Sequence, residues 1–271
     1  MTAEAATVTP RDTELLVRLH DIVGAERLST TDDARRLRAL DFSEEPGAVP
    51  LAVIEPVSTD EVARIVAAAA EHAIPLVVRG GGMSYTRAHL AAAEPTVMID
   101  MRRMDAVIEL NRDDLYVTVQ TGITWTKLRR ALGDTGLRLP FFGTLSGDYA
   151  QIGGGLAQNS AGLGKGHLAE HVRSLEVVLG DGRVVRTGSD AAAGTGPFSR
   201  HYGPDLTGLF LSDSGALGVK TAATLALEVK PGGTSFGCWA FDAARDLVGA
   251  EVEIARRGPA GSSFSRASHS C

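Results

Sequence analysis

The sequence VVRGGGMSY at residues 77–85 joins an apolar run to three consecutive glycines and a serine. Backbone N–H groups in such a stretch can converge on an anion, because glycine has no Cβ and tolerates the positive φ that an anion-binding nest requires. The hydroxyl of Ser84 could add a further donor. A plain glycine-rich turn is the alternative, and the three glycines alone do not decide between the two.

The residues before this stretch predict a strand, a helix and a second strand. Residues 51–54 and 76–78 are short apolar runs. Between them, Ser58 and Glu61 have the spacing of a capping box, and residues 62–69 continue with apolar side chains at helical spacing. This pattern indicates one βαβ unit with a right-handed crossover.

The rest of the chain shows no such regular unit. Strands are predicted at 96–101, 106–110, 115–121, 172–179, 183–187 and 218–229, and helices at 12–24, 125–132 and 241–257. The pair Asp181-Gly182 predicts a hairpin between two of these strands. Helices and strands are mixed without regular alternation, so the predicted fold class is α+β and not a doubly wound nucleotide fold.

A second glycine-rich stretch, QIGGGLAQNSAG, covers residues 151–162. Small residues in such a run suit a backbone that passes close to a flat ligand or to another helix. Gly164-Lys165 does not complete a P-loop, because Gly166 stands where Ser or Thr is required, and no GxGxxG fingerprint is present. ATPases and nicotinamide-dependent dehydrogenases are therefore disfavoured.

Composition narrows the class of protein further. The 271 residues include 27 basic and 33 acidic side chains, and the resulting net charge of −6 argues against nucleic acid as a partner. The two cysteines, Cys238 and Cys271, lie in no metal-binding motif, so no metal site is predicted. The start of the chain has no secretion signal, and no apolar stretch approaches the ~18 residues of a membrane helix. A cytoplasmic protein without an integral membrane segment is expected.

Five motifs in order carry a resemblance to a known family. They are RGGGMS at 79–84, TGIT at 121–124, the glycine-rich run at 151–162, VRSLEVVLGDGRVV at 172–185 and LFLSDSGALGVKTAATLAL at 209–227. Together they resemble the FAD-linked oxidases with a PCMH-type FAD-binding domain, the vanillyl-alcohol oxidase superfamily, over roughly residues 45–230. The resemblance implies a two-lobed α+β domain, with a small βαβ-containing lobe, a larger mixed sheet with helices, and FAD between the lobes.

The resemblance also implies roles for individual residues. The loop that holds the FAD pyrophosphate matches Arg79, Gly80, Gly81, Gly82, Met83 and Ser84. The segment that reaches the flavin ring matches Pro140, Thr144 and Ser146, and the segment along the ribityl and adenosine parts matches Ile152, Gly153, Gly154, Asn159 and Gly162. The backbone of Val219 matches a further cofactor contact. Some relatives carry a flavin-linking histidine where this chain has Met83, so the resemblance implies non-covalent FAD; no catalytic residue is assigned, and His89 is given no role.

The expected organisation has three parts. Residues 1–44 form an N-terminal helical segment, 45–230 the FAD-binding domain, and 231–271 the start of a truncated substrate domain with an irregular tail. The implied activity is oxidation of a hydroxyl-bearing small molecule with hydride transfer to flavin N5. The alternatives are a non-catalytic FAD-binding subunit, beside a partner chain that supplies the substrate domain, and a truncated inactive product.

The end of the chain adds one hypothesis. The apolar period of residues 241–257 stops within one turn, and the Ser-rich sequence that follows ends at Cys271. This change favours a frameshift or premature stop near residue 258. An ordinary flexible terminus is the alternative.

Overall fold

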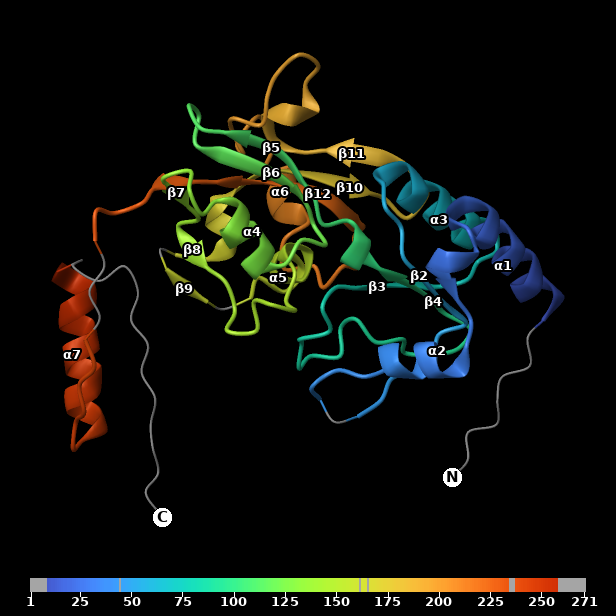
Figure 1. Ribbon diagram of the computed structural model, residues 1–271, viewed down its shortest axis with the longest axis horizontal. Coiled ribbons are helices and arrows are strands. Elements are labelled where there is room, and N and C mark those ends of the chain that lie inside the picture. The colour runs from blue at the N-terminus through green and yellow to red at the C-terminus, as the bar shows by residue number, and fades with distance from the viewer. Residues whose placement is uncertain (1–8, 44, 161, 165, 234–236, 258–271) are drawn as a thin grey trace.

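Two sheets form the body of the computed structural model, which describes residues 9–43, 45–160, 162–164, 166–233 and 237–257 (Figure 1). One sheet has four strands and the other has five. The mixture of helices with several sheets confirms the predicted α+β class.

The smaller sheet contains the predicted βαβ unit. Its strands are β1 (Leu28–Ser29), β2 (Ala52–Ile54), β4 (Val97–Asp100) and β3 (Leu76–Arg79), in that spatial order. Both β2 and β3 run parallel to β4, which lies between them. Helix α3 (Thr59–Glu71) connects β2 to β3, and α1 (Pro10–Val23) packs beside α3.

Only one of the two hydrogen bonds of the predicted capping box forms at the start of α3. The hydroxyl of Ser58 accepts the N–H of Glu61 at 3.2 Å, as predicted. The Glu61 carboxylate does not return to the backbone of Ser58; it accepts the N–H of Val57 at 2.9 Å and pairs with both guanidinium nitrogens of Arg27. A charged partner from the segment before β1 competes successfully for this carboxylate, because such bonds are stronger than neutral ones.

The larger sheet is antiparallel throughout. Its spatial order is β11 (Val184–Arg186), β10 (Val172–Val178), β12 (Val219–Ala226), β6 (Tyr116–Gln120) and β5 (Val107–Asn111). The predicted hairpin at Asp181-Gly182 joins β10 to β11, with Gly182 at φ +86°. The predicted strand 218–229 is divided at Leu227, since β13 (Glu228–Val229) leaves the sheet to pair with β7 (Leu137–Arg138).

The remaining elements are short. They are α2 (Asp32–Arg38), α4 (Trp125–Ala131), α5 (Ile152–Gln158), α6 (Leu206–Leu209), the pair β8 (Phe141–Phe142) and β9 (Leu163–Gly164), and four 3₁₀ turns at Ala25–Arg27, Met101–Arg103, Leu168–His171 and Gly188–Ala191. Helix α5 covers the glycine-rich run and was not predicted as a helix.

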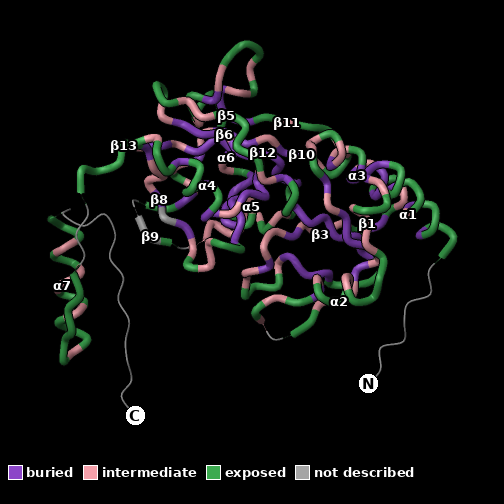
Figure 2. The backbone as a smooth tube through the Cα atoms, viewed as in Figure 1, coloured by how far each residue is buried: buried purple, intermediate pink, exposed green. Residues whose placement is uncertain are grey.

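Two clusters of buried apolar side chains form the core. The buried residues follow the inner strands, which are β2 and β4 in the smaller sheet and β10, β12 and β6 in the larger (Figure 2). The larger cluster lies between the five-stranded sheet and helices α4 and α5. The smaller cluster lies between the four-stranded sheet, α1 and α3. Val178 and Val219 belong to the smaller cluster although both lie in the larger sheet, so the two lobes share apolar side chains.

Helix α7 (Ala244–Arg257) confirms the helix predicted over 241–257 and lies apart from both sheets (Figure 1). None of its described residues is buried, and Val248 and Val252 are exposed. Residues 258–271, on which the frameshift hypothesis rests, lie outside the described residues.

Candidate functional site

The glycine loop at residues 80–84 begins at the carboxyl end of the parallel strand β3. Ligands of sheets that contain parallel strands commonly bind at this edge. Arg79, the last residue of β3, is 8% exposed, and its Nη1 donates to the carbonyls of Arg38 at 3.1 Å and Leu40 at 2.9 Å. Burial lowers the pKa of Arg79, and Asp100 opposes that effect. The guanidinium thus fixes residues 38–40 against the start of the loop.

Two of the three glycines let this loop pack against residues 149–151, where the second glycine-rich segment begins. A Cβ at Gly81 would overlap the carbonyl oxygen of Tyr149, and one at Gly80 would lie 3.1 Å from Oε1 of Gln151. Gly82 has φ +72°, and a Cβ there would overlap the guanidinium of Arg79. The two stretches singled out in the sequence are therefore in direct contact.

The end of the loop is joined to α5 through side chains. Met83 is half-buried and packs against the larger core. The Ser84 hydroxyl lies 2.8 Å from the hydroxyl of Thr86 and accepts the backbone N–H of Thr86 at 3.1 Å. The Thr86 hydroxyl donates to Oε1 of Gln158 at 3.3 Å. Ser84 thus has a partner within the chain, besides being a candidate donor to a ligand.

Helix α5 contains three consecutive glycines, each of which costs about 1 kcal/mol relative to alanine in a helix. Packing requires two of them: a Cβ at Gly153 would lie 2.9 Å from that of Thr121, and one at Gly155 would lie 3.1–3.2 Å from Leu168, Ser160 and Trp125. Gly154 differs, because it is exposed and a Cβ there would meet no atom of the described chain within 4 Å apart from its two neighbours and the backbone of its own helix. Its lack of a side chain suits close approach by a group from outside the chain.

Two unpartnered oxygens flank this helix. Oε1 of Gln151, just before α5, and Oδ1 of Asn159, at its end, are buried and have no hydrogen-bond partner among the described residues. A buried polar group without a partner costs about 1–3 kcal/mol. The hydroxyl and amino groups of a ligand such as FAD could satisfy these oxygens, so the residues fit that cofactor. Gln151 was not among the predicted site residues, although it directly precedes Ile152 and the three glycines that follow.

The segment 140–150 is hydrogen-bonded to the first residues of α4. The carbonyls of Gly147 and Ala150 accept the N–H groups of Thr126 and Trp125 at 3.0 and 3.2 Å. The hydroxyls of Thr144 and Ser146 lie 2.9 Å apart, and Pro140 is half-buried. The segment leads directly into Gln151 and α5.

The two remaining predicted contacts lie at the edges of this arrangement. Gly162 is exposed beyond the end of α5. Val219 opens β12, pairs with Val178 and is 6% exposed within the smaller core. Its side chain is therefore committed to the core, which leaves only its backbone for the predicted role.

No pattern in the sequence singled out His89 as a site residue. It is 8% exposed, and its Nε2 has no partner in the part of the chain that the structure describes. Burial and then the charge of Arg79 lower the pKa of His89 to about 4, while Asp41 opposes the shift. The surrounding alanines give no sign of this burial, which arises from tertiary packing.

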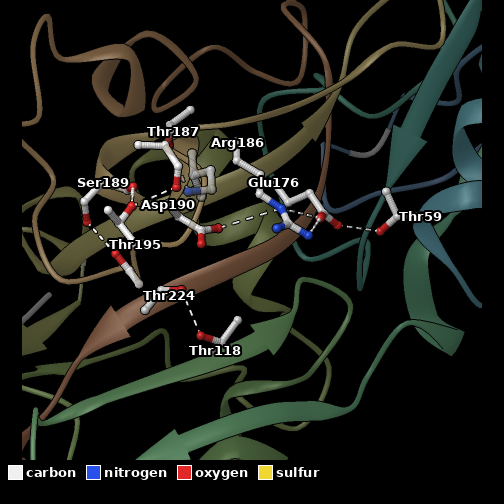
Figure 3. Close-up of polar contacts among 12 residues, drawn as sticks. Thr59, Thr118, Glu176, Arg186, Thr187, Ser189, Asp190, Thr195 and Thr224 are labelled. Carbon is white, nitrogen blue, oxygen red and sulfur yellow. Dashed lines mark hydrogen bonds and ion pairs between the residues drawn. The ribbon is translucent and has the colours of Figure 1, made fainter.

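A cavity of about 480 Å³ lies elsewhere, against β11 and the turn that follows it. Figure 3 shows the polar contacts of three residues that line it, Glu176, Arg186 and Asp190. Arg186 there donates to Oε2 of Glu176 at 3.0 and 3.1 Å and lies 3.8 Å from Asp190. Thr59 donates to the other oxygen of Glu176 at 2.7 Å. The charged groups that line the cavity are thus already paired, and no predicted site residue lines it, so it is not a candidate for FAD.

The described ranges hold neither a metal-binding cluster nor a membrane-spanning helix. They contain no group of three or more His, Cys, Asp or Glu side chains arranged to hold a metal ion. Within the same ranges, no helix combines the length and apolar character needed to cross a bilayer.

Comparison with known proteins supports the cofactor. Residues 50–188 match the family model described as "FAD binding domain". The chain is 32% identical over 217 residues to the glycolate oxidase subunit GlcD of Bacillus subtilis, covering 79% of this chain and 44% of that protein. It is 30% identical to D-lactate dehydrogenase [cytochrome] 1 of Saccharomyces cerevisiae, covering 77% of this chain and 35% of that protein. The chain therefore spans less than half the length of these relatives.

Solved structures show the same fold. A structure of p-cresol methylhydroxylase matches 83% of this chain and 45% of its own, with a TM-score of 0.71 and 21% identity. One of alkyldihydroxyacetonephosphate synthase matches 95% of this chain and 48% of its own, with a TM-score of 0.77 and 22% identity. The two-lobed PCMH-type architecture is confirmed, and with the matched residues it shows that this chain belongs to the FAD-binding domain family of the FAD-linked oxidases.

Proposed function

We propose that this chain binds FAD without a covalent bond, as the FAD-binding part of an oxidoreductase that oxidises a hydroxyl-bearing small molecule. When bound, FAD supplies the redox chemistry, by taking a hydride at N5 from the carbon that carries the hydroxyl. Glycolate and D-lactate, named in the relatives, are both 2-hydroxy acids, so this is the first substrate class to test.

The proposal assigns the glycine-rich segments to different parts of the cofactor. The main chain of residues 80–84 holds the pyrophosphate, residues 140–146 lie along the flavin, and α5 with Asn159 and Gly162 lies along the ribityl and adenosine parts, with the backbone of Val219 as a further contact. Contact of Gly80 and Gly81 with residues 149–151 supports this assignment, since one elongated ligand could touch both segments.

Gly154 carries the proposal, because no contact within the described chain accounts for it. The test is Gly154→Leu, which has room in the protein and replaces a poor helix former with a good one. We expect apo-protein at least as stable as the wild type, with FAD affinity lowered by at least about tenfold, since a leucine side chain would occupy the space of the cofactor.

Gly249→Leu is the matched control, because Gly249 is also a helical glycine with no atom of the described chain within 4 Å of its would-be Cβ. It should leave FAD affinity unchanged. Wild-type affinity in Gly154→Leu would refute the placement of FAD along α5. A wild-type chain that takes up no FAD, and shows no flavin absorption, would instead support the truncated inactive product.

Non-covalent attachment has a separate test. Met83 stands where some relatives carry the histidine that is covalently linked to the flavin. In this chain we expect the thioether of Met83 to form no covalent bond with the flavin. Acid precipitation of the FAD-loaded protein should leave all of the flavin in the supernatant. Flavin absorption that remains with the washed precipitate would contradict the proposal.

A FAD-binding subunit that works beside a catalytic partner is a second candidate. The name of the Bacillus subtilis relative describes a subunit. The exposed side chains of Trp239 and Phe241, and the apolar residues of α7, offer a surface for a partner chain. Substrate-dependent bleaching of bound flavin distinguishes this candidate from a chain that is active alone.

A further inference from the structure

A buried ion pair joins β12 to the loop before it. Nζ of Lys220 lies 2.6 Å from Oδ1 of Asp213, and the two side chains are 3% and 2% exposed. Burial lowers the pKa of Lys220, and Asp213 opposes that effect. Removing two charges from water costs several kcal/mol per ion, so such a pair is weak evidence for stability and calls for another explanation.

Asp213 holds its own loop in an unfavourable conformation. Its carboxylate accepts the N–H of Gly215 at 2.9 Å and that of Leu217 at 3.4 Å. Ser212 and Ser214 on either side have φ of +57° and +53°, a region that is unfavourable for a residue with a side chain. An unfavourable backbone conformation persists where the contacts around it hold it in place. Here the central contact is the ion pair of Asp213 with Lys220.

This loop in turn holds the last turn of α5. The N–H of Ser212 donates to the carbonyl of Leu156 at 3.0 Å, and the N–H of Ser214 donates to that of Ala157 at 2.9 Å. These carbonyls belong to the last turn of the helix, where no N–H group of the same helix is available to them. The left-handed conformations of the two serines direct their N–H groups to the helix.

The other end of α5 is tied to Lys220 as well. The Lys220 carbonyl accepts the hydroxyl of Thr121 at 2.5 Å, and the Thr121 carbonyl accepts the N–H of Gly153 at 2.7 Å. The backbone of Thr121 also donates to the carbonyl of Thr221 at 3.1 Å. Both ends of the glycine-rich helix therefore connect, through one or two hydrogen bonds, to the residues of the ion pair.

We infer that the Asp213–Lys220 pair is a positioning device that sets the place of α5, and with it Gly154, against FAD. The inference rests on the proposed placement of FAD along α5. Neither residue is catalytic, since each acts through the loop and through Thr121. A purely structural ion pair is the alternative, and it predicts that stability and FAD affinity change together.

The decisive variant is the double substitution Asp213→Asn with Lys220→Met. Asparagine keeps an acceptor for Gly215, methionine keeps an apolar stem in the buried space, and replacement of a buried ion pair by uncharged groups is often neutral for stability. We expect the melting temperature of the apo-protein to stay near that of the wild type. FAD affinity, measured by quenching of flavin fluorescence, should fall by at least about tenfold. This is the effect of losing one or two hydrogen bonds between FAD and a displaced α5.

The circular dichroism of the bound flavin at saturation gives a second readout. It should differ in the double variant, because the displaced helix changes the surroundings of the cofactor. The matched control is Asp105→Asn with Lys127→Met, an exposed Lys–Asp pair at 2.5 Å, which should keep both wild-type affinity and the wild-type spectrum. The single variant Lys220→Met leaves the Asp213 carboxylate buried without its partner, so we expect a lower melting temperature than in the double variant.

Wild-type FAD affinity in the double variant would overturn the inference and leave the proposed function intact. An equal loss in the exposed-pair control would also overturn it, because the effect would then not depend on the buried position. A wild-type chain that binds no FAD would overturn both the inference and the proposed function.

Discussion

His89 is buried beside Arg79 as a neutral imidazole with a pKa near 4. An unfolded histidine titrates near 6.5, so between these two values the unfolded chain binds a proton that the folded chain does not. This group therefore contributes full stability above pH 6.5, and the contribution is lost as the pH falls toward 4. We expect the free energy of unfolding to decrease over that window by an amount of up to about 3 kcal/mol from this residue.

Urea denaturation of the wild type and of His89→Gln, at pH 7 and pH 5, tests this expectation. The comparison cancels the carboxylates whose titration does not depend on His89, since they behave alike in both proteins. The wild type should lose more stability between the two pH values than the variant does. Equal losses would show that His89 is protonated without cost in the folded protein.

Single residues also show what the sequence could predict about the site. The triple glycine at 80–82 indicated a loop that needs close approach, and the structure agrees. The expected reason for Gly81 was access of a phosphate to the backbone, whereas the structure places the carbonyl of Tyr149 against it. Contacts between segments 70 residues apart in the chain cannot be read from local pattern, and for the same reason Gln151 and His89 were missed.

At the scale of elements, amphipathic helices and strands were predictable because their apolar period records which face is buried. Helix α5 was not, because glycine disfavours helices and the run has no apolar period. It is held by contacts with Thr121, Trp125 and the 212–214 loop, all distant in sequence. Tertiary packing thus overrides local propensity at the element proposed to contact FAD.

Helices α3 and α7 have similar length and opposite surroundings, which allows a direct comparison. Ile65 in α3 is fully buried, and truncation of such a side chain leaves a cavity, so Ile65→Ala should lower the free energy of unfolding by about 2–5 kcal/mol. Val252 in α7 is 41% exposed, and Val252→Ala should change it by no more than about 0.5 kcal/mol. Urea denaturation measures both, and an equal cost at the two sites would mean that α7 is packed in solution.

For the whole molecule, the five motifs in order were enough to predict two lobes and the cofactor, because close backbone approach to FAD restricts residue type at many positions at once. The predicted boundaries at residues 44 and 230 stay predictions. The sharing of Val178 and Val219 between the lobes was not predictable, since both read simply as strand residues.

The whole chain should hold FAD and yet turn over no substrate by itself. Oxidation of a hydroxyl group requires a side chain that takes its proton. Arg79 is the one ionisable residue among the predicted cofactor contacts, and its guanidinium donates to two backbone carbonyls. Residues 50–188 match the family model of an FAD-binding domain, so the matched residues are those of cofactor binding.

Anaerobic addition of glycolate or D-lactate to the purified, FAD-loaded chain should therefore leave the flavin absorption band unchanged. Dithionite, which reduces flavins without an active site, is the control and should bleach it fully. Rapid bleaching by either acid would show that the chain supplies the proton acceptor itself. The search for that residue would then turn to the titratable groups nearest the glycine segments, with Asp41 and His89 first among them, because both lie close to Arg79.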